Sequence, residues 1–536
     1  MESMSYAYGT NHFLRDPDLA TILDRMWPDL ARHRALLASF GDAAGSTLYE
    51  AAYHVDHEAR PVLVAHTLDG QRIDRVRLAP AERQALHDTA FIMEAPYNEL
   101  GWMGHYALLY LLADPGLACI LTITNQTAYA LKKYGAGIPG ADDIFRQLTQ
   151  GRAWGATWMT ESQGGSDLGA NRTIAVFDGA VWRLTGDKYF ASGAGLADYA
   201  IVTARPAEAV AGPKGLGLFL LPRLRRDGGL NFHVRRLKDK SATRAVPSGE
   251  VELAGSEAYL IGQPSEGIYY TLENLNVSRL ANAAAAMGIA AKARLEVWGR
   301  VRARKSFGQA LIEHPLIRRD LTDIAVRMAG GTALAFASAA QFNRVYQERP
   351  PYSPDYHEAR FMTHLAKSRT AEHSAEITRM AMELFGGLGF LDEYAVSRWH
   401  REALITPIWE GPSNIQALDF LETVRKGAHR PFLAAMESLL RLSGSFAARH
   451  TWDTMRATAE HLESASGREA QWMAKKALTT LADGAQVALL YDLAEGGSER
   501  FQKLAELYHA RFLAHQEYPA WVDGDASLWG EREADS

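Results

Sequence analysis

The chain has 536 residues, of which 47% are hydrophobic and 22% charged, a composition typical of a globular protein with several domains. Its formal net charge of −6 gives it no overall attraction to nucleic acid, and no apolar run approaches the ~18 residues of a membrane span. The single cysteine, Cys119, excludes an internal disulfide. The histidines lack metal-site spacing, so no metal is expected. Without a basic N-terminal region and apolar core, no signal peptide is expected and the protein is predicted to be cytoplasmic.

Residues 1–150 are predicted to form an N-terminal helical domain. Asp16 and Pro17 are suited to the cap and first turn of one helix, and Pro80 opens another. The segment from Trp102 to Leu112 is apolar nearly all round, which indicates a buried helix.

Residues 151–265 are predicted to form a central β-barrel-like domain. Short runs rich in Val, Ile, Phe, Trp and Thr alternate there with Gly, Asp and Pro. Asp178-Gly179, between two such runs, is a strong hairpin signal. The loops of this domain would be available for a ligand.

Residues 266–427 are predicted to form a C-terminal four-helix-bundle domain, followed by an additional helical tail over residues 428–536. A long helix is expected from Asn276 to Arg304, and Pro315 and Ser353 mark further helix starts. The tail carries balanced charge, with its acidic excess near its end, from Asp523 to Ser536. The fold class is therefore α+β and multidomain.

The segment Trp158–Asp167 has the composition of a flavin cradle. Thr160 and Ser166 offer hydroxyls, and Gly164-Gly165 would let the backbone approach a cofactor closely. Hydrogen bonds to the edge of a flavin strengthen as the ring gains electron density on reduction. The alternative is an ordinary polar loop between strands.

Three further segments each allow a functional and a structural interpretation. In a strand, Phe190 and Ser192 share one face, so the ring could lie against a flavin and the hydroxyl could form a hydrogen bond to its edge. The alternative is that Phe190 belongs to the core of the β domain. The cations of Arg302–Gly308 could bind a pyrophosphate or serve only the helix dipole. The glycines of Leu384–Phe390 could lie against a cofactor or form a helix cap and turn.

Glu410 is a candidate catalytic base. It lies in the segment Ile408–Ile415, after Pro407 and just before an expected helix. A carboxylate that removes a proton from carbon needs apolar surroundings to raise its pKa, and Trp409 and Ile408 could supply them. The alternative is a solvated carboxylate on a turn.

In this order, the motifs Met-Thr-Glu-x-x-x-Gly-Ser-Asp, Arg-Lys-Ser-Phe-Gly, Phe-Gly-Gly-x-Gly-Phe and Trp-Glu-Gly-x-x-Asn-Ile resemble those of the acyl-CoA dehydrogenase superfamily of FAD enzymes. The resemblance covers roughly residues 80 to 425. The stretches Arg236–Lys240 and Asp69–Asp74, with the added tail, are most similar to the AidB-like alkylation-response branch.

The resemblance implies specific roles. Glu410 would be the catalytic base, with Arg279 near it. The residues implied to contact FAD or substrate are Met159, Thr160, Ser166, Phe190, Ser192, Arg304, Ser306, Phe307, Glu383, Gly387 and Asn414. Arg304, Ser306 and Phe307 would reach FAD across a subunit interface, which implies a homotetramer. Glu383 replaces the Gln of relatives and Pro412 their Thr or Ser.

The function that the resemblance implies is α,β-dehydrogenation of an acyl-CoA thioester. Glu410 would take the α-proton, flavin N5 would accept the hydride, and an electron-transferring flavoprotein would receive the electrons. One alternative is an AidB-like protective flavoprotein that associates with DNA and has weak or vestigial activity, although the tail has no net basic charge. Another is a flavin oxidase or monooxygenase on the same fold.

Overall fold

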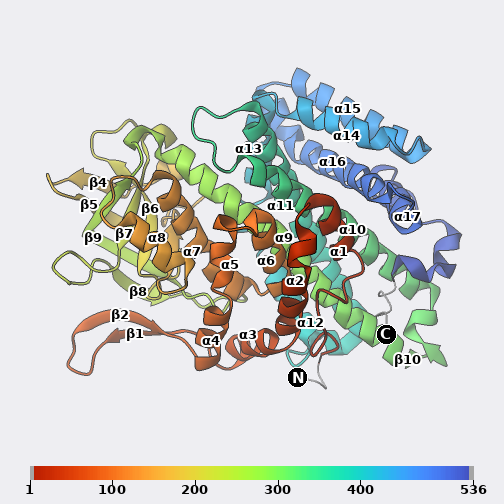
Figure 1. Ribbon diagram of the computed structural model, residues 1–536, viewed down its shortest axis with the longest axis horizontal. Coiled ribbons are helices and arrows are strands. Elements are labelled where there is room, and N and C mark those ends of the chain that lie inside the picture. The colour runs from red at the N-terminus through yellow and green to blue at the C-terminus, as the bar shows by residue number, and fades with distance from the viewer. Residues whose placement is uncertain (1–4, 530–536) are drawn as a thin grey trace. The chain divides into compact units, whose positions relative to one another are not determined.

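A computed structural model describes residues 5–529 (Figure 1). These residues fall into two units. The first unit comprises the described residues of Met1–Tyr49, Leu100–Ala113 and Arg279–Ser536. The second comprises Glu50–Glu99 and Asp114–Ser278. Helices α3 (Thr47–His57) and α9 (Gly267–Ala303) each contain a point of division.

The second unit is built on a closed ring of strands. Strand β6 pairs with β4, β4 with β5, β5 with β9, β9 with β7, and β7 again with β6, while β3 and β8 pair at the edges. The strands are β3 (Gly155–Trp158), β4 (Ile174–Phe177), β5 (Trp182–Ser192), β6 (Tyr199–Pro206), β7 (Gly217–Pro222), β8 (His233–Leu237) and β9 (Ser248–Ile261). This closure confirms the barrel-like prediction.

The predicted hairpin at Asp178-Gly179 joins β4 to β5 in antiparallel register. The Asp178 carboxylate accepts hydrogen bonds from the backbone N–H groups of Ala180 and Val181, both at 2.9 Å, and Gly179 adopts φ +94°. The side chain thus replaces backbone hydrogen bonds in the turn, as Asp commonly does.

Helices and a separate hairpin complete the second unit. Helix α7 packs against β3, β6 and β9, so it covers part of the barrel. The elements are β1 (Val62–His66), β2 (Arg72–Arg77), α4 (Pro80–Asp88), α5 (Phe91–Glu94), α7 (Pro115–Tyr134) and α8 (Ala141–Thr149). As predicted, Pro80 begins a helix.

The first unit is almost entirely helical. Besides the C-terminal part of α9, its helices are α1 (Leu19–Met26), α2 (Leu30–Gly45), α6 (Gly101–Leu112), α10 (Pro315–Val345), α11 (Pro354–Phe385), α12 (Ala395–Ala403), α13 (Ser413–Arg425), α14 (His429–Arg441), α15 (Phe446–Ser464), α16 (Gly467–Ala494) and α17 (Glu499–Tyr508). A short hairpin, β10 (Lys305–Ser306) with β11 (Gln309–Ala310), follows α9. The starts predicted at Pro315 and Ser353 are confirmed, and the Ser353 hydroxyl accepts from Tyr356 N–H at 3.2 Å.

Small residues let the helices of the first unit approach closely. A Cβ at Gly288 of α9 would lie 2.1 Å from the carbonyl oxygen of Tyr110, in α6, which is buried from Trp102 to Leu112. A Cβ at Gly330 of α10 would lie 2.7 Å from the ring of Tyr508 in α17. Both distances are below van der Waals contact, so glycine is what allows these helices to pack.

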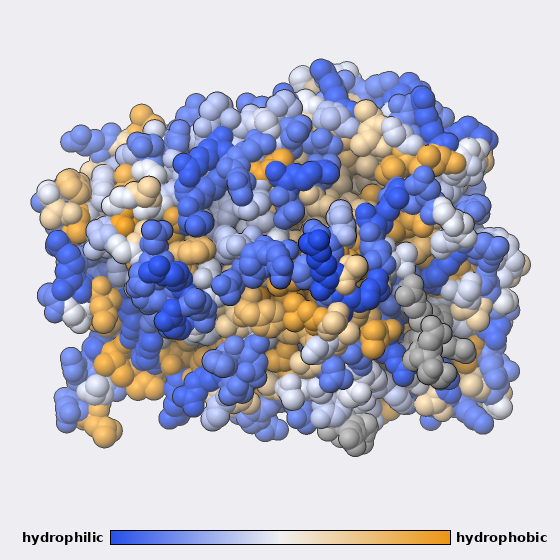
Figure 2. All heavy atoms as spheres, viewed as in Figure 1, coloured by the Kyte–Doolittle hydropathy of each residue, from blue (hydrophilic) through white to orange (hydrophobic). Residues whose placement is uncertain are grey.

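The tail is part of the helical core and not an appendage. Helix α16 packs against α10, α11 and α13 as well as against α14, α15 and α17. Its Asp483 binds the buried guanidinium of Arg369 on α11, with Nε–Oδ1 at 2.6 Å, and accepts from the Tyr508 hydroxyl at 2.7 Å. Figure 2 shows hydrophilic residues mixed with hydrophobic patches over the outer tail helices. The last part of the predicted acidic end, residues 530–536, lies outside the described residues.

These elements confirm an α+β, multidomain fold with helical segments before and after a central β region. Within residues 5–529 no helix has the length and apolarity needed to cross a membrane. The four-part division of the chain at residues 150, 265 and 427 stays a prediction.

Candidate functional site

Glu410 lies on the turn between α12 and α13, in the first unit. It is half-buried and adopts φ +57°, in the left-handed region that non-glycine residues rarely occupy. Such a conformation costs of order 1–3 kcal/mol and persists only where the surroundings fix it.

Three buried side chains fix this turn through its backbone carbonyl groups. Arg279 Nε on α9 donates to the Glu410 oxygen at 3.0 Å, and Lys367 Nζ on α11 donates to the Gly411 oxygen at 2.7 Å. The amide of Gln416 on α13 donates to both oxygens, at 2.9 and 3.0 Å. Three helices therefore hold two adjacent peptide groups. We refer to Arg279, Lys367 and Gln416 as the turn clamp.

Gly411 is what leaves room for the clamp. It adopts φ +93°, and a Cβ there would lie 2.8 Å from the Gln416 amide nitrogen and 3.3 Å from a guanidinium nitrogen of Arg279. Glycine at position 411 is thus required by both the backbone conformation and the packing.

A second set of contacts orients the clamp. Arg279 also donates to Asp419 at 2.8 Å, and the side-chain amide oxygen of Gln416 lies 3.0 Å from Nδ1 of His364. The indole N–H of Trp409 donates to the side-chain oxygen of Asn282 on α9. These contacts leave little freedom to the groups that hold Glu410.

Charge dominates the surroundings of the turn. Burial and the nearby Arg279 lower the pKa of Lys367, and Glu410 acts to raise it. The resulting pKa is about 7. Burial and Arg279 lower the pKa of His364 to about 3, so it is neutral. Burial acts to raise the pKa of Asp419, but the charge of Arg279, its hydrogen bond to the carboxylate and further nearby positive charge together lower that pKa. Of the two residues from which an apolar neighbourhood was predicted, Ile408 is 59% exposed and Trp409 is half-buried.

One donor of the clamp has no partner among the described residues. Arg279 is 2% exposed, yet its Nη1 donates to no protein oxygen within hydrogen-bonding distance. A buried N–H of this kind costs free energy unless an acceptor is bound. It therefore fits an oxygen atom of a ligand or a water molecule.

The second unit carries the predicted contacts of the Thr160 loop and of the end of β5. Thr160 follows β3, and its carbonyl oxygen accepts from Tyr189 N–H at 2.9 Å. A Cβ at Gly165 would lie 2.4 Å from the Thr160 hydroxyl, so this glycine lets the loop fold over that group. Met159 is buried, whereas Ser166 is exposed.

A buried ion pair anchors this loop to the barrel. Glu161 is 3% exposed and accepts from Lys188 Nζ of β5 at 2.8 Å, from the Thr173 hydroxyl and from backbone N–H groups. Burial alone would raise the pKa of Glu161, but Lys188 and the hydrogen bonds lower it. The acidic residue of the first motif thus positions the loop.

Phe190 and Ser192 lie at the end of β5, close to the same loop. The Trp158 indole donates to the Ser192 carbonyl oxygen at 2.9 Å. Phe190 is 58% exposed with φ +53°, and the register of β5 against β9 shifts between Lys188 and Ala191. This bulge interrupts the alternation from which a shared face was predicted. It also means that Phe190 is not a core residue.

The remaining predicted residues lie elsewhere in the first unit. Arg304 is exposed, and Ser306 and Phe307 belong to the β10–β11 hairpin, where the Phe307 ring is 97% exposed. Glu383 near the end of α11 forms an ion pair with Arg379 at 2.7 Å, and Gly387 is exposed just beyond the Gly386 cap of that helix.

Asn414 is exposed in the first turn of α13. Of all the predicted site residues, Arg279 and Glu410 are joined directly, and the Thr160 loop is joined to β5 beside Phe190 and Ser192. Sequence reasoning missed Lys367 and Gln416. The one available signal was a lysine within the small and apolar stretch Leu365-Ala366-Lys367, where a charged side chain is rarely buried unless it has partners.

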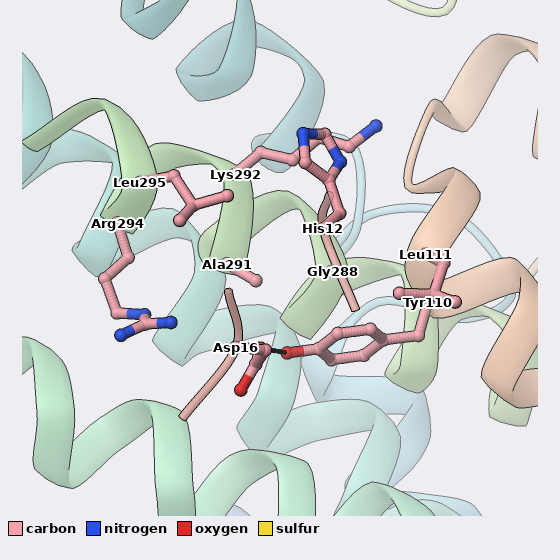
Figure 3. A pocket seen from close by; sticks show the side chains of 9 residues that line it. All are labelled: His12, Asp16, Tyr110, Leu111, Gly288, Ala291, Lys292, Arg294 and Leu295. Atoms are coloured by element: carbon pink, nitrogen blue, oxygen red, sulfur yellow. Dashed lines mark hydrogen bonds between the residues drawn. The ribbon is translucent and has the colours of Figure 1, made fainter. Parts of the chain in front are cut away.

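A small cavity in the first unit is distinct from the Glu410 turn. The volume within which the centre of a water molecule can move is about 10 Å³. The cavity is lined by His12, Asp16, Tyr110, Leu111, Gly288, Ala291, Lys292, Arg294 and Leu295 (Figure 3). That space suits about one water molecule and is far too small for a cofactor. In the part of the chain that is described, no group of three or more His, Cys, Asp or Glu side chains is placed to hold a metal ion.

Comparison with known proteins identifies the family. Residues 4–149 match the adaptive response protein AidB N-terminal domain, residues 156–255 the acyl-CoA dehydrogenase middle domain, and residues 265–424 the acyl-CoA dehydrogenase C-terminal domain. The putative acyl-CoA dehydrogenase AidB of Escherichia coli is 30% identical over 414 residues, 73% of this chain and 74% of that protein. The chain belongs to the acyl-CoA dehydrogenase family. Its N-terminal match places it in the AidB-like branch.

Other relatives agree with this membership. Acyl-CoA dehydrogenase family member 11 of Caenorhabditis elegans is 28% identical over 459 residues, 81% of this chain and 74% of that protein. The structure of Bd2924 in its apo form superimposes with a TM-score of 0.78 over 94% of this chain and 98% of that one, at 26% identity. The C. elegans ACDH-11 structure in complex with C11-CoA gives 0.85 over 94% and 91%, at 24% identity.

As a member of this family, the protein is an FAD-dependent oxidoreductase of the acyl-CoA dehydrogenase type. The residues present fit that cofactor. The hydroxyls of Thr160 and Ser192 would supply hydrogen bonds to it, and the exposed ring of Phe190 would supply an apolar face. The loop that carries Thr160 closes only because Gly165 lacks a side chain.

Proposed function

We propose that the protein catalyses α,β-dehydrogenation of an acyl-CoA thioester with Glu410 as the base that removes the α-proton. The observation that carries the proposal is the clamped turn. Three buried donors from three helices hold Glu410 in a left-handed conformation that would otherwise be unfavourable. Fixing a reactive group in advance lowers the barrier of the step that it performs.

Each residue of the clamp has a defined part in the proposal. Arg279 and Gln416 fix the Glu410 peptide, and the unpartnered Nη1 of Arg279 is a donor for an oxygen of the bound ligand or for a water molecule. Lys367 fixes the next peptide and places a titratable cation beside the base. FAD supplies the hydride acceptor when it is bound. The residues proposed as cofactor contacts are Met159, Thr160, Ser166, Phe190, Ser192, Arg304, Ser306, Phe307, Glu383, Gly387 and Asn414.

The test is substitution of the base. Glu410→Gln should retain the yellow FAD but lose bleaching by acyl-CoA under anaerobic conditions, with a rate about 10²–10⁴-fold below the native one, as expected for loss of a general base. Glu422→Gln, an exposed carboxylate on α13 paired with Arg425, is the matched control and should bleach at the native rate. Undiminished bleaching of Glu410→Gln would remove the assignment.

The electron acceptor and the assembly are part of the same proposal. We propose an electron-transferring flavoprotein as the acceptor and a homotetramer, with the exposed hairpin of Ser306 and Phe307 at a subunit contact. A fast return of the yellow colour when the reduced protein meets air would instead favour the oxidase alternative.

The DNA-associated alternative has less support from the tail. On its outer helices Arg430, Arg441 and Arg456 lie 3.1, 2.6 and 3.1 Å from glutamate oxygens. The glutamates are Glu463, Glu437 and Glu460. Cations neutralised within the protein contribute little to binding phosphates, because DNA affinity depends on unneutralised Lys and Arg.

A further inference from the structure

Three polar side chains of the second unit form a row that ends at Ser192. Lys240 Nζ lies 3.2 Å from the Ser248 hydroxyl oxygen, and that oxygen lies 3.0 Å from the Ser192 hydroxyl oxygen. Ser248 is 4% exposed and Ser192 is half-buried. We call this row the Lys240 relay.

The barrel fixes the geometry of the relay. Ser192, the last residue of β5, is the antiparallel partner of Ser248, the first residue of β9. The Gly193 N–H donates to the Pro247 oxygen at 2.8 Å, which holds the loop before β9 against the end of β5. Within that loop, Lys240 Nζ donates to the carbonyl oxygens of Thr243 at 2.7 Å and Val246 at 2.8 Å.

The chemistry of the groups sets the direction of the hydrogen bonds. An ammonium group only donates, so Ser248 accepts from Lys240. Ser248 has one proton of its own. If it donates that proton to Ser192, every buried group of the relay is satisfied, whereas the reverse direction would leave a buried hydroxyl proton without an acceptor, at a cost of about 1–3 kcal/mol. The Ser192 hydroxyl therefore accepts from Ser248 and keeps its own proton for a further acceptor.

We infer that Lys240 is a positioning residue that, through Ser248, presents the Ser192 hydroxyl as a polarised donor to an acceptor atom of the flavin ring. The inference rests on the proposed contact between Ser192 and FAD. A hydrogen bond that begins at a cation is stronger than a neutral one, and successive bonds polarise each other. Because the reduced ring is the more electron-rich form, the relay stabilises reduced FAD over oxidised FAD.

The test measures the reduction potential of the bound FAD by stepwise reduction against a reference dye, without any acyl-CoA. Lys240→Met removes the cation and keeps the length of the side chain. Ser248→Ala keeps the cation and breaks the relay. We expect each to shift the equilibrium towards oxidised FAD by about tenfold, which for a two-electron couple lowers the potential by ~30 mV. The double variant should show no larger shift, since both changes interrupt one chain.

The controls separate the relay from other effects. Arg236→Met removes an exposed cation of β8, paired with Glu250 at 2.7 Å, and should leave the potential at its native value. In a Ser192→Ala background, Lys240→Met should cause no further shift. A native potential for Ser248→Ala, or additive shifts in the double variant, would overturn the relay. If Lys240→Met does not fold, Ser248→Ala and Ser192→Ala still decide.

The outcome is independent of substrate turnover. If the native protein takes up FAD but no acyl-CoA bleaches it, the proposed dehydrogenation fails while the potentials still report on the relay. If bleaching occurs and the potentials of the relay variants are native, only the relay fails.

Discussion

The Glu410 turn and the Ser192 end of β5 fix their key residues by different means. At the turn, the clamp donors bind backbone carbonyl oxygens, so they fix the backbone conformation of Glu410. At Ser192, strand pairing already fixes the backbone, and the neighbouring groups act on the side-chain hydroxyl.

The difference follows from the secondary structure around each residue. A turn between helices has no regular hydrogen-bond ladder, so buried side chains must satisfy its carbonyl groups. A strand satisfies them within the sheet, which leaves neighbouring side chains available to polarise a hydroxyl. The two residues therefore depend on different kinds of neighbour, and substitutions can separate them.

The largest effect on stability is expected on the strand side, at the buried ion pair that anchors the Thr160 loop. Lys188→Met leaves the 3% exposed Glu161 without its cation, which should lower the free energy of unfolding by about 3–5 kcal/mol. The measurement is urea unfolding of the FAD-bound protein. The double variant with Glu161→Gln should recover part of the loss, and an unchanged midpoint for Lys188→Met would show that the pair does not hold the loop.

A smaller effect, on rate and not on folding, is expected at the turn. Arg279→Met removes the donor to the Glu410 oxygen and the partner of Asp419. Because a hydrogen bond to a charged group is worth about 1.5–3 kcal/mol, we expect anaerobic bleaching to slow by about 10- to 100-fold with the FAD spectrum intact. Arg279→Lys keeps the charge but cannot donate to two acceptors in the fixed geometry of a guanidinium. Its bleaching rate should lie between those of the native protein and Arg279→Met. A native rate for Arg279→Met would remove the clamp from the mechanism.

A third effect is expected in the pH dependence that Lys367 gives to stability. Its pKa is lowered from 10.5 to about 7 in the folded protein, so between these values the unfolded chain binds more protons at this site. The contribution of Lys367 therefore makes the free energy of unfolding rise from pH 7 to pH 10.5, and fall again as the pH is lowered.

Substitution of Lys367 isolates that contribution. Between pH 7.5 and 9.5 the urea midpoint of Lys367→Met should rise less than that of the native protein. Methionine does not titrate, so the variant lacks the pH dependence that the lowered pKa of Lys367 contributes. Lys475→Met, an exposed lysine of α16, should retain the native slope. Equal slopes for the native protein and Lys367→Met would mean that Lys367 is not the source of the pH dependence.

Local signals in the sequence predicted much of the fold. Proline and serine marked the starts of α4, α10 and α11, because these residues fit the first turn and the cap of a helix. The helix predicted from Asp16 begins two residues after Pro17, at Leu19, although the Asp16 carboxylate does accept from the N–H groups of Asp18 and Leu19 at 3.0 Å.

Local patterns were less reliable for the candidate site. The alternation rule failed at Phe190, because a bulge depends on pairing with β9 and not on the sequence of β5 alone. Of the two apolar neighbours in sequence, Ile408 is exposed to solvent, while cations from α9 and α11 approach the turn.

The sequence by itself determined the family, the helix–barrel–helix order and the identity of Glu410 as the candidate base, because short motifs and residue periodicity are local. Only the tertiary structure revealed the turn clamp, the anchoring of the Thr160 loop by Glu161 and Lys188, and the Lys240 relay. Each of these joins residues from different elements, and in the clamp Lys367 and Gly411 are separated by 44 positions. Such contacts depend on how the elements pack, which no local pattern encodes.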